Sequence, residues 1–302
     1  MHHANHISFA AIELTKKCNF ACGHCYANSS PNEPLRSNMS DSDYHEALNL
    51  LIRNGVTAVQ FIGGEPLLHP EICTFIAQCA EGGVNHIEVY TNITPLTDRH
   101  LKTFKTYGVS VATSYYSHIA AEHQATTNSK VELNRLDYNI VRCLENGIAL
   151  RVSIIITEHN SKNVEVTIAH LKELGVNDIS VDNVRSLGRQ QESAFGDKEH
   201  GLCGKCGEGQ VAIGHDGSLY PCVMARTSLG NIKIDGLNML EGRLSEWRSD
   251  TFDYPMLDSA PSGQIGICPP QQSCPPYCGP GNGPCKPRLT CQPFSISTKQ
   301  AV

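Results

Sequence analysis

The chain has 302 residues, of which 40% are apolar and 18% charged, and its 24 Lys and Arg against 30 Asp and Glu give a net charge of -6. This mildly acidic balance without a basic stripe excludes the electrostatic footprint of a nucleic-acid-binding protein, and no apolar run reaches the roughly 18 residues that a membrane span needs. The first residues, Met1 to His6, also lack the pattern of a signal peptide, so we expect a soluble, unsecreted, cytoplasmic protein with neither nucleic acid nor a membrane as partner.

Short β-rich runs alternate with amphipathic helical patterns between residues 7 and 184. The predicted strands span residues 7–14, 57–62, 86–90, 109–113, 149–156 and 179–181. Ser40 is the predicted N-cap of the first helix, with Asp43 in its first turn. The helical patterns end in glycine followed by Val or Ile, which predicts a left-handed glycine at each helix end and a strand soon after it. These glycines are Gly55, Gly83, Gly108, Gly147 and Gly175.

Six strands alternating with helices predict a parallel sheet, either open and doubly wound or curled into a full or partial barrel. Periodicity does not choose between these architectures, but in each of them the loops at the carboxyl ends of the strands carry the chemistry. The residues in these loops are Cys18, Cys22, Cys25 and Tyr26 after the first strand, Gly63, Gly64, Glu65 and Pro66 after the second, Thr91 and Asn92 after the third, and Ser114, Tyr115 and Tyr116 after the fourth. We expect them to gather on one face.

The three cysteines of the first loop are separated by three and then two residues. This spacing lets three thiolates from one loop converge on a single centre and leaves its fourth corner free for chemistry. Electron-transfer iron–sulfur sites and structural zinc sites both use four ligands, so a three-cysteine loop suits neither role by itself.

Cys18, Cys22 and Cys25 followed by Tyr26, with Gly-Gly-Glu-Pro one strand later, resemble the signature of the radical S-adenosylmethionine (SAM) enzymes. The resemblance implies an α/β fold with a partial (β/α)6 TIM-like barrel over residues 1–184. It also implies a four-iron, four-sulfur cluster on the three cysteines, with SAM chelated by the fourth iron. One electron, from a donor such as flavodoxin or ferredoxin, would cleave SAM to a 5'-deoxyadenosyl radical that abstracts a substrate hydrogen.

The resemblance further implies which residues contact SAM. They are Tyr26, Gly63, Gly64, Glu65, Pro66, Thr91, Asn92, Ser114 and Ser153. The backbone of residues 63–66 would receive the SAM amino group, since glycine permits close backbone approach. Thr91, Asn92 and Ser114 would serve equally well as helix caps or loop hydrogen-bonding groups. Where many relatives carry an arginine soon after a histidine, this chain has His123 followed by Gln, Ala, Thr and Thr, which leaves the partner of the SAM carboxylate open. His24 is predicted to screen the cluster rather than bind it.

Eight cysteines crowd residues 203–291, and the part of this stretch that is rich in Pro and Gly needs metal to order it. Its cysteine spacing and Gly217 resemble the SPASM-type extension that follows many radical SAM barrels, here a loop-rich metal-binding part over residues 185–302 with a hairpin of strands 210–213 and 219–222. The resemblance implies one auxiliary iron–sulfur cluster on Cys203, Cys206, Cys222 and Cys278 and a second on Cys268, Cys274, Cys285 and Cys291. Ile265 stands where the extension has a cysteine, so the second site would use an altered ligand order. Zinc in one or both sites is the alternative, because four thiolates suit zinc equally well.

The three scattered cysteines have a different setting. Cys73, Cys79 and Cys143 stand on predicted helices among apolar residues. We interpret them as buried core thiols rather than ligands.

The leading hypothesis for function is a radical SAM enzyme that modifies a ribosomally made peptide by cross-linking, thioether formation, epimerisation or oxidation. Because the first predicted strand begins at Ile7, a separate leader-peptide-binding protein is an expected partner. The alternatives are a radical SAM enzyme acting on a small-molecule metabolite, as a dehydrogenase, decarboxylase or mutase, and a non-catalytic iron–sulfur carrier or scaffold. The candidate substrate-facing groups, which solvated loop positions would explain equally well and none of which is assigned a catalytic role, are Tyr115, Tyr116, His118, Arg185 and Arg189.

Overall fold

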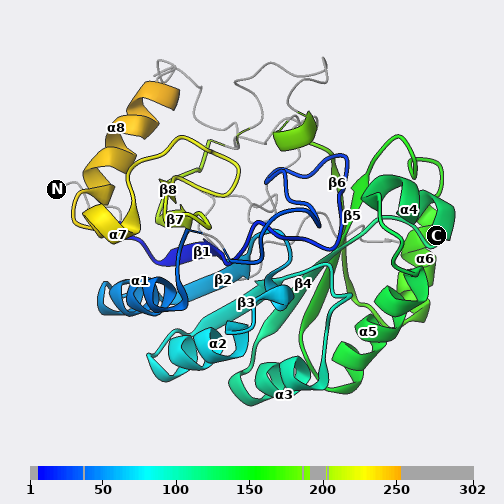
Figure 1. Ribbon diagram of the computed structural model, residues 1–302. Helices are drawn as coiled ribbons and strands as arrows, with labels where there is room; N and C mark the ends of the chain where they lie inside the picture. The colour runs from blue at the N-terminus through cyan, green and yellow to red at the C-terminus, as the bar shows by residue number, and fades with distance from the viewer. Residues whose placement is uncertain (1–5, 37, 186, 191–201, 203, 253–302) are drawn as a thin grey trace, which may run out of the picture.

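The computed structural model describes residues 6–36, 38–185, 187–190, 202 and 204–252 (Figure 1). The predicted alternation of strands and helices is confirmed, with strand ends within three residues of those predicted. The elements are β1 (Phe9–Glu13), α1 (Asp41–Arg53), β2 (Ala58–Ile62), η1 (Pro66–Leu68), α2 (Ile72–Glu81), β3 (His86–Tyr90), α3 (Asp98–Tyr107), β4 (Ser110–Tyr115), α4 (Ala120–Thr127), α5 (Leu133–Glu145), β5 (Leu150–Ile156), α6 (Val164–Glu173), β6 (Asp178–Asn183), η2 (Gly188–Gln190), β7 (Gln210–Ile213), β8 (Leu219–Tyr220), α7 (Ile232–Asp235) and α8 (Leu240–Phe252). None of the helices in these residues is long and apolar enough to cross a membrane.

The helix ends follow the glycine signal. The five predicted glycines, after α1, α2, α3, α5 and α6, all have positive φ, from 62° at Gly108 to 94° at Gly175. The residue after each glycine donates its N–H back to the last turn of the helix, as Val109 does to the Phe104 carbonyl at 2.9 Å. This closure requires a left-handed residue, which explains why glycine recurs there.

The start of α1 is also as predicted. Ser40 accepts the N–H of Asp43 at 3.2 Å, and the Asp43 carboxylate accepts the N–H of Ser40 at 2.7 Å. This reciprocal capping box satisfies two backbone donors at the helix start.

The strands form one open sheet in the order β6-β5-β4-β3-β2-β1-β7-β8. All pairs among strands β1 to β7 are parallel, and the pair of β7 and β8 is antiparallel. Helices α1, α2, α3, α5 and α6 follow one another in an arc around the outer side of the sheet (Figure 1). The sheet is therefore the partial barrel that the family resemblance implies.

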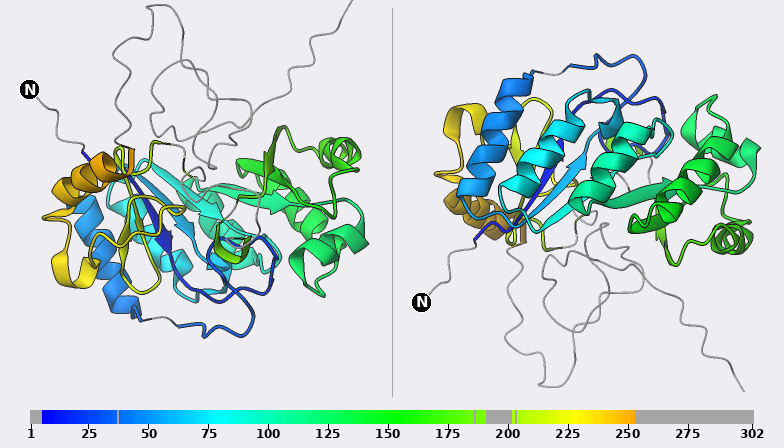
Figure 2. Two further views of the ribbon diagram at one scale, coloured as in Figure 1. Left: turned by 90° about the horizontal axis from the view of Figure 1, so that it is seen from above. Right: turned by 90° about the horizontal axis from the view of Figure 1, so that it is seen from below.

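The six predicted barrel strands and the two predicted hairpin strands are all present, and they form one sheet. The hairpin of β7 and β8 does not stand apart: β7 pairs with β1, with Gln210 opposite Phe9. Helices α7 and α8 lie beside α1 in both views of Figure 2, and Lys233 of α7 pairs with Asp43 of α1 at 2.9 Å. The sequence of a four-residue strand such as β7 does not indicate which strand it will pair with. The free edge of β1 offers the backbone donors and acceptors that β7 pairs with.

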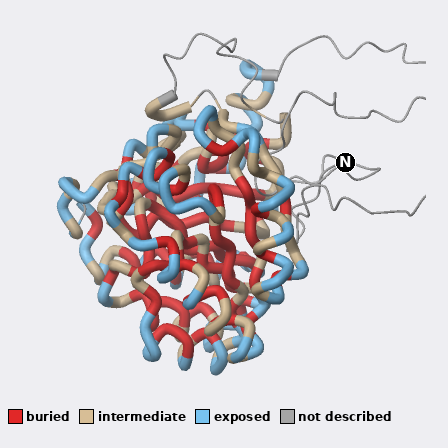
Figure 3. Tube along the Cα trace, turned by 90° about the vertical axis from the view of Figure 1, so that its right-hand side faces the viewer, coloured by how far each residue is buried: buried red, intermediate tan, exposed pale blue. Residues whose placement is uncertain are grey.

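The two faces of the sheet differ in polarity. Ile12, Phe61 and Val89 point toward the helices and belong to the main apolar core, which occupies the centre of the molecule in Figure 3. Successive strand residues point to opposite faces, so Gln60 and Glu88, which stand opposite each other in the register of β2 and β3, share the concave face.

A polar row crosses this concave face. Gln60 donates to the Glu88 carboxylate at 2.5 Å, and Arg151 of β5 binds the same carboxylate through two nitrogens, each at 2.8 Å. The Arg151 guanidinium also lies 5.5 Å from the centroid of the Tyr90 ring. Buried charges persist in proteins when they are paired and hydrogen-bonded, as here. The row thus fixes Tyr90, which is the next concave-face residue toward the carboxyl ends of the strands.

Candidate functional site

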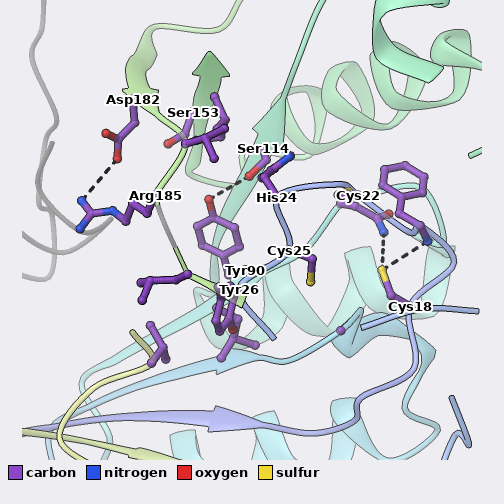
Figure 4. Close-up of a pocket in the computed structure, with 18 of the residues that line it drawn as sticks. Cys18, Cys22, His24, Cys25, Tyr26, Tyr90, Ser114, Ser153, Asp182 and Arg185 are labelled. Carbon is purple, nitrogen blue, oxygen red and sulfur yellow. Dashed lines mark hydrogen bonds and ion pairs between the residues drawn. The ribbon is translucent and has the colours of Figure 1, made fainter. Parts of the chain in front are cut away.

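A cavity of about 180 Å³ opens at the carboxyl ends of β1 to β6 (Figure 4). The predicted site residues that line it are Cys18, Cys22, Cys25, Tyr26, Gly63, Gly64, Thr91, Asn92, Ser114 and Ser153. Of the predicted SAM contacts, Glu65 and Pro66 do not line it. Parallel strands bring their carboxyl ends to one edge, so the expected gathering of these loops on one face is confirmed.

Two sulfurs of the cysteine loop accept hydrogen bonds from nitrogen donors. Cys18 Sγ accepts the backbone N–H of Phe20 at 3.3 Å and the side-chain amide of Asn92 at 3.7 Å, the two dashed lines at Cys18 in Figure 4. Cys25 Sγ accepts the backbone N–H of Ser29 at 3.4 Å. N–H groups directed at sulfur stabilise negative charge there, which is the charge that a ligand thiolate carries.

Burial governs the ionisation of the free thiols. It raises the pKa of Cys22 to about 12, with the neighbouring Cys25 adding to the shift, and it raises the pKa of Cys18 still further. The Tyr116 hydroxyl, 3.8 Å from Cys22 Sγ, and the charge of Arg189 act in the opposite direction on Cys22. Because a coordinating metal deprotonates a thiol outright, these neutral thiols become thiolates only when metal binds.

The loops after β1 and β2 approach each other so closely that glycine is required. Gly64 N–H donates to the Thr15 carbonyl at 2.7 Å, and Glu65 N–H donates to the Lys17 carbonyl at 2.9 Å. A Cβ on residue 64 would overlap the Lys17 oxygen, and one on Gly63, whose φ is 142°, would stand 2.6 Å from the Thr15 oxygen. These contacts by themselves require glycine at positions 63 and 64, because the cysteine loop packs directly on the loop after β2.

The Glu65 carboxylate holds loops together and does not line the cavity. It is fully buried and accepts the Leu67 N–H at 3.0 Å, the Thr91 hydroxyl at 2.6 Å and the Asn92 N–H at 2.7 Å. Burial raises the pKa of Glu65 to about 7, and the three hydrogen bonds oppose that rise. Pro66 follows as the first residue of η1, the helix position that suits proline.

Thr91 and Asn92 have the loop hydrogen-bonding role that the sequence analysis gave as one of two alternatives. The Thr91 hydroxyl is committed to Glu65, whereas the Asn92 amide reaches Cys18 Sγ and also donates to Asn19 Oδ1 at 2.7 Å. Both residues still line the cavity. They are thus loop-holding groups that also border the thiols.

Hydroxyl groups of β3 to β6 line up on the concave wall. The Tyr90 and Ser114 hydroxyls lie 3.0 Å apart (Figure 4). The hydroxyls of Ser153 and Ser180 lie 2.7 Å apart. Tyr90 was missed by the sequence analysis, although its spacing of two from Glu88 along β3 assigns both to the same face.

An ion pair between the buried Glu13 and the more exposed Arg226 supports Tyr26. Arg226 pairs with Glu13 at 2.5 Å, and its guanidinium lies 5.3 Å from the Tyr26 ring centroid and 5.0 Å from that of Tyr220. Arg226 therefore joins β1, the cysteine loop and the hairpin. Sequence analysis missed both charged residues, and the available signal was an acidic residue within the otherwise apolar strand β1.

The hairpin brings two further cysteines together. Cys206 before β7 and Cys222 after β8 are both buried, with their sulfurs 2.9 Å apart. Cys222 Sγ also accepts the N–H of Ala225 at 3.3 Å. The other predicted auxiliary ligands, Cys203, Cys268, Cys274, Cys278, Cys285 and Cys291, lie outside the described residues.

The remaining cysteines are not near the cavity lining. Cys79 and Cys143 are fully buried and Cys73 is 8% exposed, all three within the main core. Their interpretation as core thiols is confirmed.

The candidate substrate-facing residues divide into two groups. Arg185, which pairs with Asp182 at 3.8 Å, and Tyr116 line the cavity. Tyr115 donates to a carboxylate on α5 and the His118 ring contacts a hydroxyl on α6, so both are committed to the outer helices. Asp182, on the opposite side of the cavity from Cys18 in Figure 4, was missed because β6 reads as a short strand ending one residue earlier.

Arg189 neither faces the cavity nor stands free in solvent. It donates from Nη1 to the Cys22 carbonyl at 2.5 Å, from Nη2 to the Ser29 carbonyl, and from its backbone N–H to the Cys25 carbonyl at 3.1 Å. The expectation of a substrate-facing or solvated residue is therefore wrong for Arg189, which hydrogen-bonds to the main chain of the cysteine loop instead.

The segment that replaces the expected arginine supports the cysteine loop from the other side. The Thr127 carbonyl accepts the N–H of Ala21 at 2.9 Å. His123 is fully buried against Phe20 and Tyr116, both ring centroids at 5.8 Å, and neither ring nitrogen has a partner among the described residues. Burial lowers the pKa of His123 to about 4, so the ring is neutral.

His24 lies on the cavity wall. Its ring meets that of Tyr116 edge-on at 5.2 Å, and burial, followed by the charge of Arg189, lowers its pKa to about 4. A neutral ring at this place suits the predicted role of shielding the thiols from water.

The donor set of the loop fits an iron–sulfur cluster. Among the described residues, no three His, Cys, Asp or Glu side chains converge closely enough to share a single metal ion. Three thiols spread along one cavity wall instead suit a multinuclear cluster, in which each cysteine binds a different iron. Their N–H donors and the low polarity of the wall match what such a cluster requires.

Comparison with known proteins gives the family. The family model of the Radical SAM superfamily matches residues 12–184. The antilisterial bacteriocin subtilosin biosynthesis protein AlbA of Bacillus subtilis is 26% identical over 303 residues, which cover 86% of this chain and 66% of AlbA. GTP 3',8-cyclase of Aquifex aeolicus is 29% identical over 170 residues, covering 55% of this chain and 53% of the cyclase. The chain thus spans less than two thirds of the length of these curated relatives.

A solved structure supports the fold. Streptococcus suis SuiB bound to precursor peptide SuiA superposes with a TM-score of 0.61 at 16% identity, covering 86% of this chain and 68% of SuiB. The family model covers more than half of the chain, including the cysteine loop and the glycine loop that packs on it. This chain belongs to the radical SAM superfamily.

Proposed function

We propose that this chain is a radical SAM enzyme in which Cys18, Cys22 and Cys25 hold a four-iron, four-sulfur cluster and SAM occupies the adjoining cavity. The observation that carries the proposal is that three thiols of one loop line the same cavity as the loops after β2 and β3. When bound, the cluster and SAM supply one-electron cleavage of SAM and abstraction of a substrate hydrogen.

In this proposal the chain's own groups bind the cluster and SAM, orient them and shield them from water. The N–H of Phe20 and the amide of Asn92 stabilise charge on the Cys18 sulfur. The carbonyl oxygens of residues 63 and 64 are the proposed acceptors for the SAM amino group, since the N–H of Gly64 is committed to Thr15. The predicted contacts of Tyr26, Thr91, Ser114 and Ser153 with SAM belong to the same proposal. Apolar lining, such as Ile62 and Val223, keeps water from the reacting groups.

A second metal site belongs to the proposal. Cys206 and Cys222 stand 2.9 Å apart and are buried, which supports their assignment as two ligands of the first auxiliary cluster, with Cys203 and Cys278 as the others. Cys268, Cys274, Cys285 and Cys291 are the proposed ligands of a second one. The proposed division of the chain is a barrel over residues 1–184 and an auxiliary-cluster part over residues 185–302.

The proposed substrate is a ribosomally made peptide. The alignment with AlbA, a bacteriocin biosynthesis protein, covers 86% of this chain and therefore extends well beyond the barrel, whereas that with GTP 3',8-cyclase covers 55%. SuiB, which shares the fold over 86% of this chain, was solved with a precursor peptide. A flavodoxin or ferredoxin is the proposed electron donor.

The first test is anaerobic reconstitution of the full chain with iron and sulfide. We expect about twelve irons per chain, four for each of three clusters, and 5'-deoxyadenosine formed from SAM under dithionite. A Cys22→Ser variant should lose this SAM cleavage while keeping the auxiliary metal. About four irons per chain together with zinc would mean that the cysteine loop holds the one iron–sulfur cluster and that the auxiliary sites hold zinc. If no 5'-deoxyadenosine forms at any metal content, the chain is an iron–sulfur carrier instead of a radical SAM enzyme.

The second test addresses the substrate. The full chain is co-expressed with each short peptide encoded beside its gene, and each peptide is then examined by mass spectrometry. A mass change that depends on intact Cys22 supports the peptide assignment. GTP serves as the small-molecule comparison, and its conversion without any peptide modification would overturn the assignment.

A further inference from the structure

Two arginines from beyond β6 make the same contact with two different cysteines. Arg189 Nη1 donates to the Cys22 carbonyl at 2.5 Å, and Arg248 Nη1 donates to the Cys206 carbonyl at 2.6 Å. Cys22 belongs to the cysteine loop of the barrel, and Cys206 belongs to the hairpin site. Each candidate metal site therefore has one guanidinium bound to the main chain of one of its cysteines.

At the barrel site the contact spans the whole second half of the loop. Besides Cys22, Arg189 binds the carbonyl of Ser29 through Nη2 and that of Cys25 through its backbone N–H. Three donors of a single residue thus fix carbonyl groups at positions 22, 25 and 29. A planar guanidinium can do this because its donors have a fixed geometry, which lysine lacks.

The backbone next to Arg189 is in close contact with the cysteine loop. Gly188 has a φ of 59°, and a Cβ there would overlap the Cys25 carbonyl oxygen and stand 2.5 Å from that of Tyr26. No other residue type satisfies both the left-handed conformation and this approach. Gly188 therefore lets the segment after β6 lie directly on the cysteine loop.

Arg189 also brings the positive charge of its guanidinium to the cysteine loop. Its three hydrogen bonds to the cysteine loop all go to carbonyl oxygens, and within the described ranges no carboxylate pairs with it. Its position beside the cysteines is partly buried, where solvent screening is weaker than at the surface. A positive charge next to an iron–sulfur cluster favours the more negative, reduced state.

We propose that Arg189 is a positioning residue for the cluster of the cysteine loop. It fixes the loop through the carbonyls of Cys22, Cys25 and Ser29, and its charge raises the reduction potential of the cluster. The charge effect rests on the proposed function, whereas the loop contacts exist without metal.

The first experiment measures the potential in the reconstituted full chain. Wild type, Arg189→Met, Arg189→Lys and Arg248→Met are titrated with mediators at an electrode, and the cluster is identified by the paramagnetic signal that changes on adding SAM. In this titration the cluster takes up one electron from the mediators, and no bond is made or broken. For Arg189→Met we expect about a tenfold lower equilibrium constant for reduction, a shift of about 59 mV to more negative potential. Arg189→Lys and Arg248→Met should stay close to wild type. Equal potentials in wild type and Arg189→Met would overturn the charge effect, as would equal shifts in both Arg189 variants.

The second experiment needs no metal. It tests the loop-fixing role of Arg189 even if the Arg189→Met variant fails to retain iron. Hydrogen exchange is measured on the metal-free full chain at the amides of residues 18–30. We expect faster exchange there in Arg189→Met and wild-type exchange in Arg248→Met, whose contacts lie at Cys206 and Gly204. Unchanged exchange of this segment in Arg189→Met would overturn the loop-fixing role. Failure of the wild type to cleave SAM would refute the proposed function and leave the exchange result standing.

Discussion

The hydroxyl of Thr91 donates to Glu65 Oε1 across 2.6 Å. Glu65 stands in the loop after β2 and Thr91 in the loop after β3, so this contact joins two neighbouring loops at the cavity. The same carboxylate is fully buried and receives the N–H of Asn92 at 2.7 Å. Asn92 in turn donates to Cys18, so the setting of a proposed cluster ligand depends on Glu65.

Replacing Glu65 by Gln should therefore weaken the fold and the cysteine loop together. The Gln amide keeps one oxygen for the two donors at Oε1 but turns an N–H₂ group toward the N–H of Asn92, so at least one buried donor loses its acceptor. We expect a loss of about 1–3 kcal/mol in the free energy of unfolding, measured with denaturant. Thr91→Ser, which keeps the hydroxyl, is the matched control. A Glu65→Gln variant as stable as Thr91→Ser would contradict this role.

Gly64, in the loop after β2, allows a test of how closely this loop packs on the cysteine loop. A Cβ on Gly64 would overlap the backbone oxygen of Lys17, which cannot move without shifting the cysteine loop. Gly64→Ala should cost about 3 kcal/mol and reduce the iron retained after reconstitution. Gly23→Ala is the control within the cysteine loop itself, because a Cβ there meets nothing within 4 Å. Equal iron content in the two variants would show that the packing tolerates a methyl group.

Local patterns in the sequence were enough to predict the helices, the parallel sheet and the cysteine loop. A left-handed glycine such as Gly108, or the capping pair of Ser40 and Asp43, acts within a few residues, so its outcome is visible in the sequence. The strand alternation likewise assigned the site to one edge of the sheet. These features do not depend on which distant segment packs against them.

The features that sequence analysis missed are contacts between distant segments. Glu13 and Arg226 are 213 positions apart, and Arg189 binds a loop 167 positions earlier. The same holds for β7, whose pairing with β1 depends on an open sheet edge. Gly63 and Gly64, in the loop after β2, are a further case. Glycine is required there because carbonyl groups of the cysteine loop, which is distant in the sequence, approach so closely. Such contacts leave no periodic pattern in the chain.

The hairpin cysteines predict a selective loss of metal. Cys222 lies 2.9 Å from Cys206, so Cys222→Ser removes a proposed ligand of the first auxiliary cluster. We expect this variant to retain the iron of the cysteine loop and to lose about four irons, or the zinc that replaces them. Metal analysis per chain measures this. Cys73→Ala, at a core thiol, is the control and should lose no metal; an equal loss in both variants would point to general instability.

Protonation of His123 predicts acid sensitivity of the fold. Its buried ring has no hydrogen-bonding partner among the described residues, and burial lowers its pKa from 6.5 to about 4. Between these pH values the unfolded chain binds a proton at His123 and the folded chain does not. Stability is therefore lost as the pH falls through this window. The difference in pKa corresponds to about 3 kcal/mol.

Replacing His123 by Phe should remove this sensitivity, because Phe fills the space among the rings of Phe20, Tyr115 and Tyr116 without a titrating group. We expect the variant to be more stable than the wild type at pH 4.5 by about 2–3 kcal/mol, with a smaller difference at pH 7.5. Denaturant unfolding at both pH values gives this comparison. His100, whose pKa burial also lowers to about 4, and Glu65, whose pKa burial raises to about 7, are present in both proteins, so their contributions cancel in the difference. A difference between the proteins that does not change with pH would mean that the His123 ring finds a partner for its proton on acidification.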